Sequence, residues 1–256
     1  AINLTGNTVT GNLNFGISVS ASNGNELSGN IISGNSSNGL VINGSSNKIS
    51  NNSIYGNGIS GNGAGVYVES GNNNSILNNS IYNNSVLGIE LAAGTNDSQG
   101  FPTLNIFYTW QDESALPEIK GGTAVQGTLN STIASQNYEI QFFANSSASQ
   151  REGKRYLGEV DVTTDISGKA DFLANLKDAV LFTGEVLSST ATKLDLNSNA
   201  LSTSEFSPSI ERALDEGDHY IVNTTLAGIP LHWKDGKGDY QIAQSVVGLG
   251  YDDDIQ

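Results

Sequence analysis

The sequence predicts an all-β fold in three parts: a short parallel β-helix of about four coils, an antiparallel β-sandwich and a β-rich C-terminal tail. Three observations predict it. A repeat runs through residues 1–97, alternating apolar and polar residues fill 104–207, and short hairpin-like segments occupy 208–256. The repeat breaks after Thr95, and residues 98–103 are expected to form a linker.

The repeat is visible as a glycine followed by an alternating strand, at Gly16, Gly39, Gly65 and Gly88. A spacing of 23 to 26 residues is typical of a solenoid whose coils each carry about three short strands. Equivalent residues of neighbouring coils then stack about 4.8 Å apart. We therefore expect two inward columns, Leu4, Leu27, Ile49 and Ile76 in one and Val9, Ile32, Ile54 and Ile81 in the other.

Asparagines recur at two fixed places in each coil. Asparagine tolerates the left-handed backbone of a sharp turn, and its amide can bond to the same amide one coil away. We predict that both columns are structural and bind no ligand: Asn7, Asn30, Asn52 and Asn79, and Asn12, Asn35, Asn57 and Asn84.

One coil is irregular, because eight residues separate Asn57 from Gly65 where the other coils use four. The extra segment Gly58–Gly61 is predicted to be a loop on one edge of the solenoid. Insertions in solenoids fall on one face, which is often the binding face. A tolerated surface loop is the simpler interpretation of this segment, and a binding edge is the alternative.

The pattern Asn-x-Ile-x-x-Asn with Gly-Ile-x-Val resembles the right-handed parallel β-helix repeat family, of the pectate-lyase-like superfamily. That family includes pectin-degrading enzymes, alginate epimerases and many secreted bacterial proteins. The following module resembles an immunoglobulin-like domain of large bacterial surface and secreted proteins, through Phe101–Leu104 and Ile140–Asn145 among other segments. The resemblance implies a bacterial protein at the cell surface or outside the cell, acting as a spacer, binder or assembly module.

Five to seven strands are expected in the second module, and the clearest covers residues 137–144 with Tyr138, Ile140 and Phe142 on one face. In the tail, residues 229–234 and 239–244 are predicted to pair around Asp235-Gly236, with a third strand near 220–222. The tail is too short to fold alone, so we expect it to pack on the sandwich or to add a strand to a neighbouring molecule.

Composition excludes several classes of function. The net charge of −15 makes nucleic acid an improbable partner, and no apolar run is long enough for membrane insertion. The chain has no cysteine, so thiolate metal sites, disulfides and cysteine catalysis are excluded. The acids of the repeat, Glu26, Glu69 and Glu90, are dispersed, and the two histidines lie in the tail. We therefore predict no catalytic residues, no cofactor and no enzymatic activity.

Two candidate sites emerge from the predicted surface. Tyr55 and Tyr82 would point outward on adjacent coils, with Tyr67 and Glu90 on another face, and such groups can stack on sugar rings and bond their hydroxyls. The alternative is that tyrosine simply suits exposed strands.

The second candidate is a calcium site, because Asp195, Asn197 and Glu205 offer oxygen ligands. The preferred interpretation is that these residues stabilise a turn by hydrogen bonds to the backbone.

The function that we infer from the sequence is an extracellular, non-enzymatic structural or adhesive protein. Its C-terminal β segment would mediate assembly, with itself or with another surface protein as partner, and glycans as a possible ligand. The alternative is a carbohydrate-binding module, or a fragment of a polysaccharide lyase or epimerase.

Overall fold

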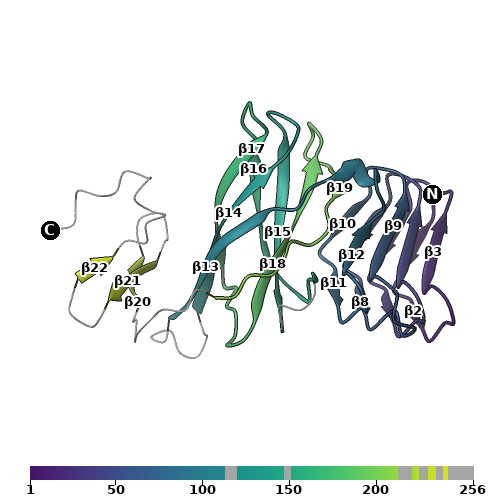
Figure 1. Ribbon diagram of the computed structural model, residues 1–256, viewed down its shortest axis with the longest axis horizontal. Coiled ribbons are helices and arrows are strands. Elements are labelled where there is room, and N and C mark those ends of the chain that lie inside the picture. The colour runs from purple at the N-terminus through teal and green to yellow at the C-terminus, as the bar shows by residue number, and fades with distance from the viewer. Residues whose placement is uncertain (113–119, 147–150, 213–220, 225–229, 235–238, 242–256) are drawn as a thin grey trace.

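The computed structural model describes residues 1–112, 120–146, 151–212, 221–224, 230–234 and 239–241. Figure 1 shows a solenoid at the N-terminal end, two larger sheets beside its last coil, and a small sheet near the C-terminus. Apart from one turn of 3-10 helix, Asn96–Ser98, every regular element of the described residues is a strand. The predicted all-β fold is therefore confirmed, with a parallel solenoid of about four coils followed by antiparallel sheets.

The solenoid has three parallel sheets, and each coil adds one short strand to each sheet. One sheet contains β1 (Asn3–Thr5), β4 (Glu26–Ser28), β7 (Lys48–Ser50) and β10 (Ser75–Leu77). The second contains β2 (Thr8–Thr10), β5 (Ile31–Ser33), β8 (Ser53–Tyr55) and β11 (Ser80–Tyr82). The third contains β3 (Ile17–Ser20), β6 (Leu40–Asn43), β9 (Val66–Ser70) and β12 (Ile89–Leu91).

Strand register confirms the predicted aliphatic columns. Leu27 lies between Leu4 and Ile49, and Ile54 lies between Ile32 and Ile81. Because alternate residues of a strand face opposite ways, these side chains all enter one core, and most of them are fully buried. A coil cannot bury its apolar face alone, so the stack supplies the stability that each repeat lacks.

The recurring glycines mark a close approach between coils. A Cβ atom built on Gly39 would lie 2.7 Å from the carbonyl oxygen of Gly65 and 2.9 Å from Cγ2 of Ile54. Such contacts are too short for any side chain, so the position requires glycine for space rather than for backbone freedom. The same crowding between coils applies at Gly16 and Gly65, whereas at Gly88 the close neighbour is the Phe206 ring of the sandwich.

The asparagine columns form hydrogen-bonded ladders, as predicted. Asn52 shows the pattern: its N–H and Nδ2 both donate to Oδ1 of Asn79 at 2.9 Å, and its own Oδ1 accepts the same pair of donors from Asn30. A third ladder that the sequence reasoning missed runs through Asn25, Asn47, Asn74 and Asn96. Asn96 was expected where the repeat breaks, yet it continues this ladder.

The next module consists of two antiparallel sheets packed face to face. One sheet contains β13 (Thr103–Asp112), β14 (Lys120–Asn130) and β17 (Lys169–Lys177). The other contains β16 (Arg155–Thr163), β15 (Asn137–Asn145), β18 (Val186–Leu194) and β19 (Ala200–Thr203). Tyr138, Ile140 and Phe142 lie on the predicted common face and are buried against the first sheet in one core. We call this module the sandwich.

The sandwich closes the C-terminal end of the solenoid with hydrogen bonds to all three solenoid sheets. Gly153 pairs with Ile81 as an antiparallel bridge, at 2.8 and 2.9 Å. Oγ1 of Thr203 accepts the N–H of Ile76 at 2.9 Å, and Oε1 of Glu205 accepts the N–H of Leu91 at 3.1 Å. The last strands are therefore not left as open edges, which would otherwise be sites of uncontrolled pairing.

Two phenylalanines of the sandwich also enter the solenoid core. Phe143 and Phe206 belong to the same buried cluster as the aliphatic columns, with ring centroids 5.3 Å apart and planes at 86°. This edge-to-face pair covers the apolar end of the last coil. The solenoid and the sandwich thus share one hydrophobic core at their junction.

The tail residues that the structure describes form a sheet of their own. Strand β21 (Pro230–Lys234) pairs with β20 (Ile221–Thr224) on one side and with β22 (Asp239–Gln241) on the other. The predicted hairpin is confirmed by the register that places residue 233 opposite residue 240. Residues 220, 229, 235–238 and 242–244, which were included in the predicted strands and turn, lie outside the described residues.

Candidate functional site: a cleft between solenoid and sandwich

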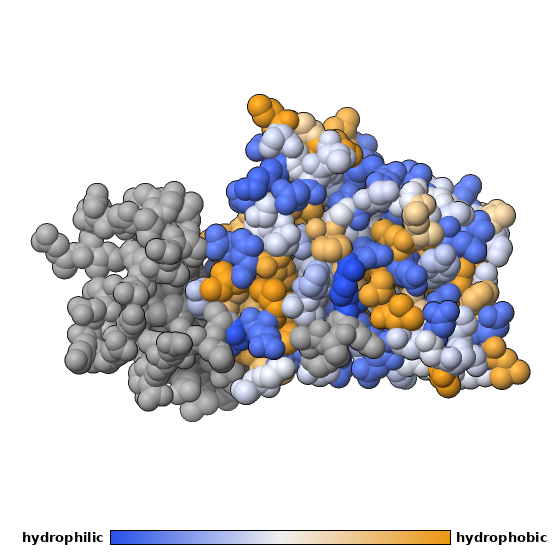
Figure 2. All heavy atoms as spheres, in the orientation of Figure 1, coloured by the Kyte–Doolittle hydropathy of each residue, from blue (hydrophilic) through white to orange (hydrophobic). Residues whose placement is uncertain are grey.

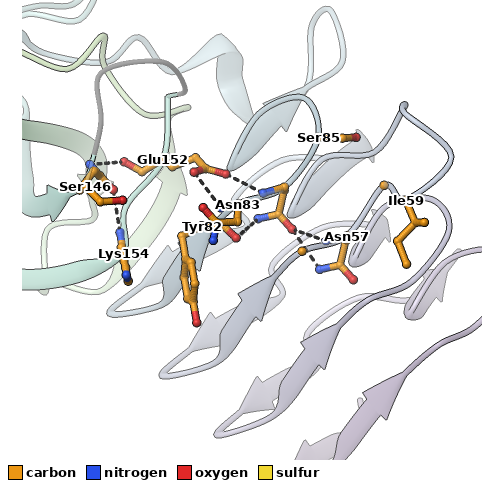
Figure 3. Close-up of a pocket in the computed structure, with 12 residues that line it drawn as sticks. Asn57, Ile59, Tyr82, Asn83, Ser85, Ser146, Glu152 and Lys154 are labelled. Carbon is orange, nitrogen blue, oxygen red and sulfur yellow. Dashed lines mark hydrogen bonds between the residues drawn. The ribbon is translucent and has the colours of Figure 1, made fainter.

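A cleft of about 430 Å³ lies where the solenoid meets the sandwich. Figure 3 shows its lining, which comes from two coils on one side and from the sandwich on the other. The residues are Gly56, Asn57, Gly58, Ile59, Tyr82, Asn83, Asn84, Ser85, Asn145, Ser146, Glu152 and Lys154. Binding sites for small ligands typically measure about 300–1,000 Å³, so this cleft has room for one.

Strand β11 and the corner after it form the solenoid wall of the cleft. Tyr82 points outward from β11 and stacks on Tyr55 of the coil before, with ring centroids 5.1 Å apart and planes at 12°. Burial, and then the neighbouring Tyr55, raises the pKa of the Tyr82 hydroxyl, which stays protonated at neutral pH. Asn83, the next residue, adopts the left-handed backbone conformation with φ of 54° at the turn after β11, and it is exposed.

The predicted loop Gly58–Gly61 forms the edge of the cleft. Gly58 has φ of 84°, and a Cβ atom there would lie 2.8 and 2.9 Å from the backbone N and O of Gly63, so glycine is required at this position. The next residue, Ile59, lines the cleft with 70% of its surface exposed. The insertion lies at the edge of the cleft, since Gly58 and Ile59 both line it. That it serves as a binding edge remains a prediction.

The sandwich wall is positioned by Asn145. Its Oδ1 accepts the N–H of Lys154 at 2.9 Å, and its Nδ2 donates to the carbonyl oxygen of Glu152 and to Oγ of Ser188. These bonds hold the segment against the solenoid, and Oγ of Ser80 donates to the carbonyl oxygen of Lys154 at 2.6 Å. The Lys154 ammonium lies 5.2 Å from the ring centroid of Tyr82, which places a positive charge at the cleft.

Glu152 is the carboxylate of the cleft lining, and its oxygens are already engaged. Oε2 accepts the N–H of Asn83 at 2.9 Å, and Oε1 accepts the N–H of Asn84 at 2.8 Å. Burial raises the pKa of Glu152, and the hydrogen bonds from Asn84 and Asn83 oppose that shift. The side chain therefore takes the place that the next asparagine of the ladder would occupy.

The four residues considered for glycan contact lie in two pairs on two different sheets, the arrangement expected from the repeat. Tyr55 and Tyr82 lie side by side in one sheet, and Tyr67 and Glu90 lie side by side in another, as their registers show. Tyr82 lines the cleft. Burial, and then the Glu205 carboxylate, raises the pKa of Glu90, so the sandwich reaches that second face as well.

The residues considered for calcium have other partners. Oδ1 of Asp195 accepts the N–H groups of Asn197 and Asn199 at 2.8 Å, and the Asn199 amide donates to Oδ2. The Asn199 bonds hold the pKa of Asp195 below its ordinary value, as in a tight turn. Glu205 instead pairs with Arg151 at 3.0 Å. Among the described residues no group of three or more His, Cys, Asp or Glu side chains gathers where it could hold a metal ion.

Most of the cleft was missed by sequence reasoning. Asn83, Ser85, Glu152 and Lys154 were not singled out, because they come from segments that only the docked sandwich brings together. Two signals were available in the sequence. One was the outward Tyr82, and the other was the insertion at Gly58–Gly61, which breaks the spacing of the repeat on the coil beside the cleft.

Comparison with known proteins finds a family match for the solenoid. Residues 1–109 match the family model described as a right handed beta helix region. No curated protein sequence matches the chain. In the part of the chain that the structure describes, no helix is long and apolar enough to cross a membrane.

Two solved structures of a phage tailspike protein are similar to this chain. One is full-length tailspike protein 2 from Escherichia coli O157:H7 bacteriophage CAB120, at 11% identity and a TM-score of 0.23. The other is the enzymatically active domain of tailspike protein 2 from bacteriophage CBA120, at 12% identity and a TM-score of 0.21. Each similarity covers 75% of this chain, which spans 39% of the first structure and 43% of the second.

Proposed function

We propose that this chain is an extracellular, non-enzymatic adhesive module that binds carbohydrate in the cleft between solenoid and sandwich. The observation that carries the proposal is the cleft itself. It combines an aromatic side chain, Tyr82, with the hydrogen-bonding groups of Asn83 and Ser146 and with the Lys154 ammonium. Sugar rings need both an aromatic contact and convergent polar groups.

A binding role is favoured over a catalytic one by the state of Glu152. A general acid or base must be able to exchange a proton with the substrate. Both oxygens of Glu152 accept backbone N–H groups of the last coil, and the residue is 7% exposed. We therefore assign this carboxylate to closing the solenoid.

An extracellular location is part of the same proposal. It is supported by the resemblance of the repeat to exported bacterial proteins, and by the resemblance of the following module to the immunoglobulin-like domains of such proteins.

A glycan array probed with the full chain tests the proposal, followed by calorimetric titration of the best ligand. We expect Tyr82→Ala to weaken binding about tenfold or more, as the loss of an aromatic anchor does. Tyr67→Ala is the matched control, because Tyr67 also points outward but on another sheet. Equal loss of affinity in the two variants, or an array without any bound glycan, would refute a cleft that binds sugar.

Self-association through the tail is a second part of the proposal. In the described residues β20 and β22 each pair on one side only, which leaves each with an edge that could add a strand from another molecule. Light scattering over a range of concentrations measures this directly. Growth of the mean mass with concentration is expected, and a monomer at every concentration would remove this part while leaving the cleft unaffected.

A further inference from the structure

The lip of the cleft carries an exposed aliphatic side chain on a firmly held loop. Ile59 donates its N–H to the carbonyl oxygen of Asn35 at 3.3 Å, and Ser60 donates its N–H to that of Ser36 at 3.1 Å. Gly58 donates to the carbonyl oxygens of Asn35 and Ser37 at 2.9 Å each. The loop is therefore tied to the coil before it, and the position of Ile59 is fixed by the backbone.

Ile59 differs in kind from the rest of the lining. The other groups that reach the cleft are mainly amides, hydroxyls and charges, and Figure 3 places Ile59 at the opposite end of the view from Lys154. Figure 2 shows hydrophobic and hydrophilic surface side by side where the solenoid meets the sandwich. A ligand that spans the cleft would thus meet polar groups and one aliphatic contact.

Single exposed aliphatic residues are common on protein surfaces and need no special account. Ile166 is such a case, since it is 93% exposed in a hairpin turn of the sandwich. Ile59 is distinguished because it lines a cleft and because its loop is an insertion that the other coils lack. An apolar side chain in that place gains free energy only from an apolar group on the ligand.

We propose that the cleft takes a sugar that carries a methyl group, and that Ile59 is the residue that selects for it. The methyl group could belong to an N-acetyl substituent or to a 6-deoxy position, and both present the same aliphatic contact. This inference rests on the proposed carbohydrate binding. Tyr82 would contact the sugar, Asn83 and Ser146 would meet hydroxyl groups, and Ile59 would cover the methyl group.

Matched pairs of glycans test the inference on the full chain. N-acetylglucosamine oligomers are compared with glucose oligomers of the same length and linkage, and fucosylated glycans with their L-galactose counterparts. Burying one methyl group at a half-open lip corresponds to about three- to fivefold in affinity. We expect that preference in at least one pair, and the pair that shows it identifies the source of the methyl group.

Two variants separate the role of Ile59 from a general effect. Ile59→Thr removes an apolar contact from an exposed position, so it should fold normally and lose the preference, while Ile59→Val should keep most of it. Ile166→Thr is the control and should leave affinity and preference unchanged. Glycan binding without preference, or a preference that survives in Ile59→Thr, overturns the inference but not the proposed function. Binding of no glycan in any arm overturns both.

Discussion

Replacement of Glu152 tests whether the sandwich is a cap for the solenoid. Each ladder asparagine donates its N–H to the next coil, so the last coil ends with donors that need an acceptor. Glu152 provides that acceptor for Asn83 and Asn84 at 2.9 and 2.8 Å. Glu152→Ala leaves both N–H groups without it, and Glu152→Gln can satisfy one of them but presents an amide NH₂ to the other.

The size of the effect follows from these contacts. Hydrogen bonds to a charged group contribute about 1.5–3 kcal/mol each, so two contribute roughly 3–6 kcal/mol. Burial of the carboxylate opposes folding, and the raised pKa of Glu152 indicates that this cost outweighs the hydrogen bonds in the balance between its charged and neutral forms. Removal of the side chain nevertheless leaves two N–H groups without an acceptor, at about 1–3 kcal/mol each, and regains only part of the burial cost. We therefore expect Glu152→Ala to lower the free energy of unfolding by about 2–3 kcal/mol, and Glu152→Gln by about 1–2 kcal/mol.

Urea unfolding followed by circular dichroism measures both values. Glu211→Ala is the control, because Glu211 is exposed and a surface change of this kind should alter stability by less than about 0.5 kcal/mol. If Glu152→Ala were as stable as this control, or Glu152→Gln more stable than the parent chain, the carboxylate would not close the ladder and the account of the cap would be wrong.

Three further changes test other parts of the structure. Asn52→Ala removes a buried acceptor of two donors and should cost about 2–4 kcal/mol in urea unfolding, against a few tenths for the exposed Asn14→Ala. Phe206→Ala opens a cavity at a residue 1% exposed, so we expect a loss of about 3–5 kcal/mol by the same measurement. Burial, and then the Glu159 carboxylate, raises the pKa of Glu139 from 4.5 to about 7. The folded state therefore holds this proton more tightly, and stability should fall as pH rises from about 4.5 to about 7, by about 1–2 kcal/mol after allowance for solvent screening. Urea titrations across this range should show the slope in the parent chain and a smaller one in Glu139→Gln; equal slopes would contradict the assignment.

The solenoid could be predicted from the sequence because its contacts repeat. A column such as Leu27, Ile49 and Ile76 is set by one period, so finding the period fixes the vertical neighbours of every residue in it. The same period predicts that Tyr55 lies beside Tyr82, and the strand register confirms it. The third asparagine ladder was also within reach, since Asn25 and Asn47 stand two residues before inward aliphatic residues, as Asn30 stands before Ile32.

The cap and the cleft could not be predicted in this way. Glu152 bonds to residues almost seventy positions earlier in the chain, and Thr203 bonds to Ile76 from still farther away. No repeat connects such pairs, because each contact occurs once. A carboxylate that replaces an asparagine at the end of a ladder has no local sequence signal, and it becomes recognisable only when the sandwich is docked.

A crystal structure of the full chain with the glycan selected on the array tests the central claim most directly. The account predicts a sugar in the cleft in contact with Tyr82 and Asn83, with its methyl group against Ile59. A sugar bound instead on the outer wall at Tyr67 and Glu90, with the cleft holding only solvent, would contradict it.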